Sequence, residues 1–364
     1  MADATRIAGL LALGLLAASV ATRPAAACTT VLLTHGEDVV VAKSYDYYMG
    51  QGHIVVNPRG LAKSSMVFGH EKAASWVARY GSVTFNQYGR ELPCSGMNEA
   101  GLVVEVMWLD ETRYENPDAR PVVPDLQWIQ VQLDRWATVA EVVKHADELR
   151  VSSQTARIHF LACDRTASCA TIEFLDGKLV VHAGDAMPVR TLTNDTYETS
   201  CAYLARHEGF GGTQAVPSSL ESLDRFVRAS SLAAAAGRRD RGLPGLVDDG
   251  FAILDSVSMG PNSVWNLVYE PRKGRVHYRT AAQPRIKRID LTALDQSCAS
   301  GARWLDLDAE RWGDVTRWLY PYDAAANVRL VRTTFRRSRV PIPAGAATLV
   351  GRFPDRFRCS DPTP

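Results

Sequence analysis

The sequence contains no run of Lys and Arg residues interleaved with aromatic residues. Its basic residues are dispersed among an almost equal number of acidic ones, so the formal net charge is only +1. Chains that bind nucleic acids usually carry a basic stripe or patch, so we expect no nucleic-acid partner. The eight histidines are also scattered, with no metal-ligand spacing to one another or to a cysteine pair. We therefore expect no metal site.

A glycine-rich phosphate loop between a strand and a helix is missing as well. The nearest candidate, GFGGT at 209–213, does not have the strand before it and the helix after it that such a loop requires. The chain also lacks the alternation of strands and helices that builds βαβ units. This argues against a parallel, doubly wound sheet.

One apolar run stands out, from Ile7 to Ala21, with Arg6 before it and small residues after it. Ala25 and Ala27 occupy the minus-three and minus-one positions before a cysteine. This pattern predicts a secretory signal peptide over residues 1–27, because the run is too short to cross a bilayer.

The mature chain should therefore begin at Cys28 and be secreted or periplasmic. We expect residues 28–364 to form a single domain, since no stretch among them resembles a linker. No further apolar run is long enough to span a bilayer, so we expect no membrane partner after signal cleavage. Lipid attachment to Cys28 is an alternative, although "TRP" separates the apolar run from the cysteine, unlike in a typical lipoprotein signal.

Seven cysteines begin with Cys28, and an odd number in an exported chain leaves at least one thiol unpaired. The segment FLACDRTASCATIEF is typical of a hairpin in which Cys163 and Cys169 lie on facing strands, so these two could be bridged. Cys298 and Cys359 could form another bridge. Cys28 is then the natural unpaired residue.

Strand-like runs rich in β-branched and aromatic residues alternate with turns, and two longer segments have apolar residues at helical spacing. Consecutive hairpins interrupted by helices predict an α+β fold of antiparallel sheets covered by helices. The predicted strands are 29–34, 38–45, 53–57, 101–109, 156–163, 169–174, 178–183, 263–271 and 275–281, and the predicted helical segments are 125–149 and 219–237.

The first two strands flank the turn HGED at 35–38 and should form an antiparallel hairpin. Counting back from this turn places Cys28 opposite Tyr45 or Asp46. Lys43 lies three residues before Asp46, so on a regular strand the two side chains point to opposite faces. Both can serve one site only if the strand bends or bulges.

A cysteine at a newly formed N-terminus has its own base. The free α-amine titrates near pH 7.7 to 8.0, roughly, so it can accept the proton of the thiol and later give it to a leaving amine. Asp46 could hold that ammonium, and a nearby cation would favour the thiolate. The alternative is that Cys28 is half of a disulfide and Asp46 is a solvated strand end.

Six segments, in this order and spacing, resemble the choloylglycine hydrolase and penicillin V acylase family of N-terminal nucleophile hydrolases, most of all its Gram-negative penicillin V acylase branch. The resemblance covers most of the mature chain. It implies an αββα sandwich of two stacked antiparallel sheets between helical layers. The segments are CTTVLL, VVAKSYDY, SGMNEAGLVVEVMWL, VRTLTNDTYE, SLESLDRFVRAS and SVWNLVYEPRKGRVHYRT.

The resemblance assigns roles to individual residues. Cys28 becomes the nucleophile and Asp46 positions its α-amine. Asn194 becomes a side-chain donor to the oxyanion of the tetrahedral intermediate, helped by the backbone N–H of Trp108. Arg225 becomes the cation beside the thiol.

Simpler roles exist for two of these residues. Arg225 could be an exposed helix residue paired with Glu221, and Asn194 a turn residue. Arg228, one turn after Arg225, is expected to be a supporting or surface residue.

Two positions depart from the bile-salt hydrolases of this family. Lys43 stands where they usually have arginine, which keeps the charge but loses the planar fork of donors. Trp108 stands where they usually have asparagine, and it lacks the side-chain amide. Together with Tyr47, Trp108 would provide an aromatic wall for an acyl pocket.

These observations predict an exported amidohydrolase that cleaves small linear N-acyl amides through a thioester on Cys28, without a metal or organic cofactor. Penicillin V, acyl-homoserine lactones and bile salts are the substrate types implied. Relatives are commonly tetrameric, so the resemblance also implies a homotetramer. The alternatives are a dipeptidase with an N-terminal cysteine, and a non-catalytic periplasmic binding protein or lipoprotein.

Overall fold

The computed structural model describes residues 27–67, 70–152, 156–338 and 345–360. The predicted signal segment, residues 1–27, lies outside this part of the chain except for Ala27, so its removal stays a prediction. Within the described ranges, no helix combines the length and the apolar character needed to cross a membrane.

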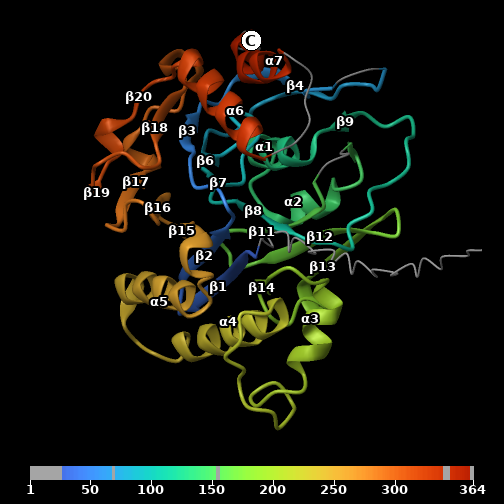
Figure 1. Cartoon of the computed structure of the whole chain (residues 1–364), viewed down its shortest axis with the longest axis vertical. Coiled ribbons are helices and arrows are strands. Elements are labelled where there is room, and N and C mark those ends of the chain that lie inside the picture. The colour runs from blue at the N-terminus through green and yellow to red at the C-terminus, as the bar shows by residue number, and fades with distance from the viewer. Residues whose placement is uncertain (1–26, 68–69, 153–155, 339–344, 361–364) are drawn as a thin grey trace, which may run out of the picture.

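Two large sheets dominate the structure (Figure 1). The first sheet has seven strands and is antiparallel except for the pairing of its last two strands. In spatial order these strands are β14 (Thr191–Leu192), β1 (Thr29–His35), β2 (Asp38–Asp46), β15 (Ser263–Glu270), β16 (Arg275–Thr280), β17 (Lys287–Asp290) and β19 (Gly313–Asp314).

The second sheet has nine strands, all paired antiparallel. In spatial order they are β13 (Lys178–Ala183), β12 (Cys169–Leu175), β11 (Ile158–Cys163), β8 (Val103–Trp108), β7 (Ser95–Asn98), β6 (Ser82–Asn86), β3 (His53–Asn57), β18 (Arg303–Asp306) and β20 (Tyr320–Pro321). Two small sheets complete the strands: β21 (Arg358–Cys359) with β4 (Leu61–Ser64) and β5 (Ser75–Val77), and β10 (Arg150–Val151) with β9 (Val122–Val123).

Helices cover the outer faces of both large sheets. Helices α4 and α5 pack on β1, β2 and β15, whereas α1 and α2 pack on β7, β8, β11 and β12. The α-helices of the described residues are α1 (Asp125–Arg135), α2 (Val139–Lys144), α3 (Tyr197–Leu204), α4 (Ser222–Ala236), α5 (Gly242–Ser256), α6 (Ala324–Ser338) and α7 (Ala346–Arg352). The expected αββα sandwich is therefore confirmed.

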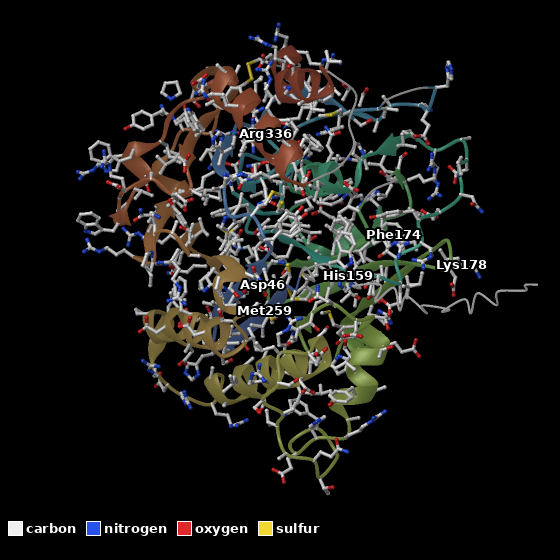
Figure 2. All side chains as sticks on the ribbon, viewed as in Figure 1. Asp46, His159, Phe174, Lys178, Met259 and Arg336 are labelled. Atoms are coloured by element: carbon white, nitrogen blue, oxygen red, sulfur yellow. A yellow bond between two sulfur atoms is a disulfide. The ribbon has the colours of Figure 1, made fainter. Side chains whose placement is uncertain are left out.

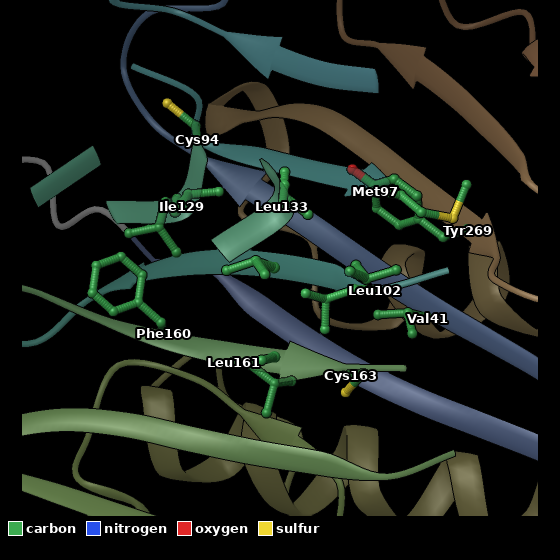
Figure 3. Packing of buried hydrophobic residues seen from close by; sticks show 14 of the residues in the cluster. Val41, Cys94, Met97, Leu102, Ile129, Leu133, Phe160, Leu161, Cys163 and Tyr269 are labelled. Carbon is green, nitrogen blue, oxygen red and sulfur yellow. The ribbon is translucent and has the colours of Figure 1, made fainter. Parts of the chain in front are cut away.

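Alternation along the strands builds two separate cores. In β1, Val31 and Leu33 pack against α4 and α5, whereas Leu32 faces the second sheet. The inter-sheet core continues through Val41 and Leu161, which Figure 3 shows packed among side chains from both sheets. The central strands are buried on both faces, which explains their nearly continuous apolar runs.

The predicted helical segment 125–149 is wrong in one respect, because the structure breaks it into α1 and α2. Thr138 begins α2 by accepting a hydrogen bond from the Glu141 backbone, and Glu141 bonds back to the Thr138 backbone. This capping box starts a new helix where the apolar spacing suggests continuity. Helices α3, α5, α6 and α7 were not predicted.

Both expected disulfides are present. Cys163 and Cys169 lie directly opposite each other on β11 and β12 and are bonded, and Cys298 is bonded to Cys359. Among the described residues, Cys28, Cys94 and Cys201 carry free thiols. The interpretation of Cys28 as half of a disulfide is therefore wrong.

Candidate active site

Cys28 lies immediately before β1, at the end of the central hairpin. Thr29 pairs with Ser44, so Cys28 lies opposite Tyr45, as predicted. Thr30 lies directly opposite Lys43, and paired residues share a face of the sheet with their second neighbours along each strand. The thiol and Lys43 therefore face the second sheet.

Contacts across the inter-sheet space confirm this orientation. The Lys43 ammonium donates to the backbone carbonyl of Val106 and lies 3.1 Å from the sulfur of Met107, both on β8. The hydroxyl of Thr30 donates to the same sulfur at 3.2 Å. The cation is fully buried next to the thiol.

Asp46 points to the opposite face of the first sheet, as the spacing predicts. Its Oδ1 accepts hydrogen bonds of 2.5 Å from the hydroxyls of both Ser44 and Ser263. Ser263 reaches this position because the register between β15 and β2 shifts by one residue before Trp265. The bulge thus lies in β15, whereas the sequence led us to expect a bend or bulge in β2 itself.

Backbone contacts link Asp46 to Cys28 even though their side chains face different ways. The Asp46 carbonyl accepts from the N–H of Ala27 at 3.3 Å, and the Asp46 N–H bonds to the Cys28 thiol. The second carboxylate oxygen, Oδ2, is buried and has no partner within the described residues. Lys43 and Asp46 therefore reach Cys28 from two sides, one at the thiol and one at the backbone.

Burial is the largest influence on the pKa of both groups. It raises the pKa of the Cys28 thiol, whereas Lys43 and Arg225 lower it and Asp46 raises it further. Burial also raises the pKa of Asp46 to about 6, against the opposing effects of the two serine hydroxyls and the two cations. The thiolate thus depends on its two cationic neighbours.

Arg225 enters the site from α4 and is only 1% exposed. Its Nη1 donates to the Cys28 carbonyl at 2.8 Å and to the Thr29 hydroxyl at 2.7 Å, and its Nη2 donates to Asn194 Oδ1 at 2.7 Å. The alternative of an exposed helix residue paired with Glu221 is therefore wrong. The planar guanidinium thus donates to each of these three acceptors in a fixed direction.

Asn194 lies in the turn after β14, and both ends of its side chain are held. Oδ1 accepts from Arg225, and Nδ2 donates to the Trp108 carbonyl at 2.9 Å. The Asn194 backbone N–H also donates to the hydroxyl of Ser222 at 2.8 Å. One hydrogen of the Nδ2 group remains for a ligand, because a side-chain amide carries two.

The backbone of Trp108 faces the same place. Leu109 donates to the Arg157 carbonyl on the neighbouring strand at 2.9 Å. Peptide groups in an antiparallel pair bond alternately to the two sides, so the N–H and carbonyl of Trp108 point away from β11 and towards Asn194. The two predicted oxyanion donors are thus adjacent.

Tyr47 and Trp108 belong to the aromatic surroundings of the site. The Tyr47 ring packs on Tyr45 at 5.9 Å and on Tyr48 at 4.3 Å, and its hydroxyl lies 3.1 Å from that of Tyr88. The Trp108 indole instead donates to Asp110 at 2.7 Å. The two side chains are therefore held in place by different partners.

Two buried pairs of polar side chains support the site, and sequence reasoning missed both. Glu105 on β8 lies 3.9 Å from the Lys43 ammonium, and both side chains are fully buried. Burial raises the pKa of Glu105 to about 7, and Lys43 lowers it. The signal that could have revealed this pair is an acidic residue inside the otherwise apolar strand VVEVMW.

The second pair consists of His159 and Glu173, which support the turn of Asn194. His159 Nε2 lies 2.9 Å from the carbonyl of Thr193, and Nδ1 lies 3.0 Å from Glu173. Glu173 also accepts from the Tyr197 backbone at 3.0 Å, at the start of α3. Figure 2 shows His159 in the interior near the level of Asp46.

Arg228 has the supporting place expected for it. It donates to the carbonyls of Ser256, Pro217 and Ser219, and so ties α4 to the loops around it. Within the described residues, no group of His, Cys, Asp and Glu side chains is arranged to hold a metal ion. The arrangement offers a nucleophile, two cations and two pre-aimed N–H donors, which is the equipment for acyl transfer.

Comparisons with known proteins identify the family of the chain. The chain is 27% identical to a penicillin V acylase of Pectobacterium atrosepticum over 340 residues, which covers 81% of this chain and 89% of that protein. The structure of penicillin V acylase from Agrobacterium tumefaciens superimposes with a TM-score of 0.71 at 27% identity, over 81% of this chain and 98% of that one. A variant of conjugated bile acid hydrolase from Clostridium perfringens, at 18% identity, shares the fold with a TM-score of 0.63, over 81% and 97% of the two chains. Residues 28–302 match the model of the linear amide C-N hydrolases, choloylglycine hydrolase family, and the chain belongs to that family.

Proposed function

We propose that this linear amide hydrolase is exported, is cleaved before Cys28, and hydrolyses N-acyl amides through a thioester on that residue. The observation that carries the proposal is the buried Asp46 carboxylate, whose Oδ2 has no partner within the described residues while its backbone contacts both Ala27 and Cys28. Removal of Ala27 would turn the Cys28 nitrogen into an ammonium group, which we propose as the partner of this oxygen. An opposite charge there would lower the pKa of Asp46 from about 6 and hold the α-amine in place.

The chemistry follows from these positions. The α-amine of Cys28 takes the thiol proton, and the sulfur attacks the carbonyl carbon of the amide. The oxyanion forms beside the free hydrogen of Asn194 Nδ2 and the N–H of Trp108. The C–N bond then breaks as the leaving amine takes the proton from the α-ammonium. Water attacks the thioester in the same way, with the α-amine as base, and releases the acid.

The aromatic walls favour an aryl or long straight acyl group. Tyr47, Tyr88 and Trp108 present flat apolar surfaces that suit a phenoxyacetyl group or an extended chain better than a bulky hydroxylated steroid. The names of the relatives from Pectobacterium and Agrobacterium point to penicillin V as a substrate type. Specificity should lie mainly in the acyl part.

The substrate test offers the mature protein penicillin V, a long-chain acyl-homoserine lactone and glycocholate at equal concentration, and follows release of the free amine. We expect the first two to be cleaved and glycocholate to be a poor substrate, with Cys28→Ala inactive on all three. Preferred turnover of glycocholate would contradict the proposed acyl selectivity. Inactivity on every amide would favour the dipeptidase or the binding protein.

The mechanism has its own test, because the thiol and the base belong to one residue. Mass determination of the mature N-terminus should find a free Cys28, whereas a diacylglyceryl adduct would identify a lipoprotein. One alanine added before Cys28 should abolish turnover and leave the fold intact, since the α-amine is then lost to a peptide bond. Full activity in the extended protein would exclude the N-terminal nucleophile mechanism.

A further inference from the structure

The arginines that are dispersed along the C-terminal part of the sequence gather on one end of the folded molecule. The described segments 324–338 and 345–360 carry seven arginines and a single carboxylate, Asp355. The whole chain, by contrast, is almost neutral. Figure 1 places the two helices of these segments, α6 and α7, together at the top, at the opposite end from α4 and α5.

Helix α6 divides sharply into a buried and a charged face. Val331 and Thr334 are fully buried against the protein. Arg329, Arg332 and Arg336 follow one another at spacings of three and four residues, and all three are exposed. Figure 2 labels Arg336 on this helix. The charged face therefore points to solvent.

The charged face of α6 continues onto α7. The guanidinium of Arg332 donates to the Thr348 hydroxyl of α7 at 2.8 Å, which fixes the two helices side by side. Leu349 follows directly and is 68% exposed, although it is a large apolar residue. Arg352 comes three residues later, on the same side of the helix. We call these exposed residues the C-terminal arginine surface: Arg329, Arg332, Arg336, Arg337, Leu349 and Arg352.

Little of this charge is neutralised within the protein. Arg329 lies 3.4 Å from Asp323, and Arg352 lies 3.5 Å from Asp355, in pairs whose arginines are 67% and 64% exposed. Such exposed pairs are screened by water and salt. The other contacts are to neutral groups, such as the bond from Arg337 to Gln51. The surface therefore presents a positive potential to a partner.

We propose that the C-terminal arginine surface docks the protein onto an anionic lipid bilayer. Guanidinium groups bind phosphate headgroups, and the exposed Leu349 between them can enter the boundary between headgroups and acyl chains. A nucleic acid fits less well, because binding of bases uses exposed aromatic rings. Here Phe353 and Phe357 are buried, and Phe335 packs on Tyr88.

The helix that carries the docking surface contacts the segment of the proposed acyl wall through its buried face. Thr334 of α6 donates to the Gln87 carbonyl at 2.7 Å, and the neighbouring Tyr88 carries the hydroxyl that contacts Tyr47. A bilayer bound at α6 would thus lie on the same side of the molecule as this wall. This last link, to acyl substrates, rests on the proposed function, whereas docking itself does not.

The experiment measures sedimentation of the purified protein with vesicles of phosphatidylcholine alone or mixed with phosphatidylglycerol. We expect binding only to the mixed vesicles, weakening as salt is added. The double variant Arg329→Glu with Arg336→Glu should bind at least about tenfold more weakly. Its matched control, Arg238→Glu with Arg239→Glu, changes the same charge in the loop between α4 and α5 at the opposite end and should bind normally (Figure 1).

Three outcomes would overturn the proposal: equal binding to neutral vesicles, an equal loss in the control variant, or no binding at low salt. Binding of duplex DNA in preference to vesicles would assign the surface to nucleic acid instead. Leu349→Ser should weaken binding without changing charge. The variant Arg329→Glu with Arg336→Glu should hydrolyse dissolved penicillin V as fast as the unmodified protein. Sedimentation therefore tests the docking proposal, and hydrolysis in solution tests the proposed function.

Discussion

Arg225 Nη2 and Asn194 Oδ1 are joined by a hydrogen bond of 2.7 Å, which couples the cation beside the thiol to the amide beside the oxyanion. The bond fixes the orientation of the Asn194 amide, because an oxygen facing a guanidinium leaves Nδ2 facing the site. In the proposed mechanism, nucleophile activation and oxyanion stabilisation would therefore share one contact.

Asn194→Ala should lower kcat by about 10²–10³-fold and change KM little, because it removes a donor that acts on the transition state. Steady-state kinetics on penicillin V measure both constants. Asn194→Asp serves as a second test: it keeps the size of the side chain but replaces the donor with an acceptor and should be equally slow. A rise in KM with unchanged kcat would contradict the oxyanion role.

Arg225→Ala should raise the pKa of the Cys28 thiol, since one of its two stabilising cations is lost. The rate of alkylation by iodoacetamide, measured against pH in the mature protein, reports this pKa. Arg228→Ala is the control, because that guanidinium donates to the carbonyls of Ser256, Pro217 and Ser219 and should leave the profile in place. Identical profiles of alkylation rate against pH for the two variants would show that Arg225 has only a structural role.

Glu173→Gln tests the support beneath Asn194. The His159 ring bridges Glu173 and the turn, because Nδ1 lies 3.0 Å from the Glu173 carboxylate and Nε2 lies 2.9 Å from the Thr193 carbonyl. Loss of that carboxylate should loosen the turn and lower kcat by roughly tenfold or more, with little change in KM. His182→Gln, which alters a ring 3.6 Å from the other oxygen of Glu173, should have a smaller effect. Equal losses from both variants would point to general destabilisation.

Glu105 should make folding stability dependent on pH. Its pKa is raised from 4.5 to about 7 by burial, so the folded state holds the proton more tightly than the unfolded state. The stabilisation is fully present below pH 4.5 and is lost as the pH rises through 7. Over that interval the free energy of unfolding should fall by about 3 kcal/mol more than in Glu105→Gln, as measured by chemical denaturation. Parallel curves for the two proteins would show that Glu105 does not titrate there.

Local signals are sufficient to predict the central hairpin. Alternation and a short turn narrow the register of β1 and β2, so counting residues back from the turn places Cys28 opposite Tyr45 or Asp46, and the structure has Tyr45 there. The same counting places Lys43 and Asp46 on opposite faces. It cannot show that Ser263 binds the Asp46 carboxylate, because that contact depends on the bulge in β15, a strand more than two hundred residues away.

Burial of charge is harder to predict than secondary structure. Arg225 lies 197 residues from Cys28 in sequence and 31 from Asn194, so nothing next to it distinguishes it from a surface arginine. Without the family resemblance, its neighbour Glu221 is the more obvious partner. Helix α6 was not predicted although Val328, Val331 and Phe335 repeat at helical spacing. Its many arginines obscure that apolar stripe.

The order of strands in the first sheet predicts how the site loses its structure on heating. Cys28 precedes β1, Asp46 ends β2 and Asn194 closely follows β14, and these three strands are hydrogen-bonded neighbours with β1 in the middle. These three proposed site residues therefore lie on one sheet, whereas Trp108 lies at the end of β8 in the second sheet. Neighbouring strands of one sheet often open as one cooperative unit, so the amide protons of β14, β1 and β2 should exchange together. On heating, activity should be lost at the temperature at which these amides lose their protection from exchange, and not at a lower temperature.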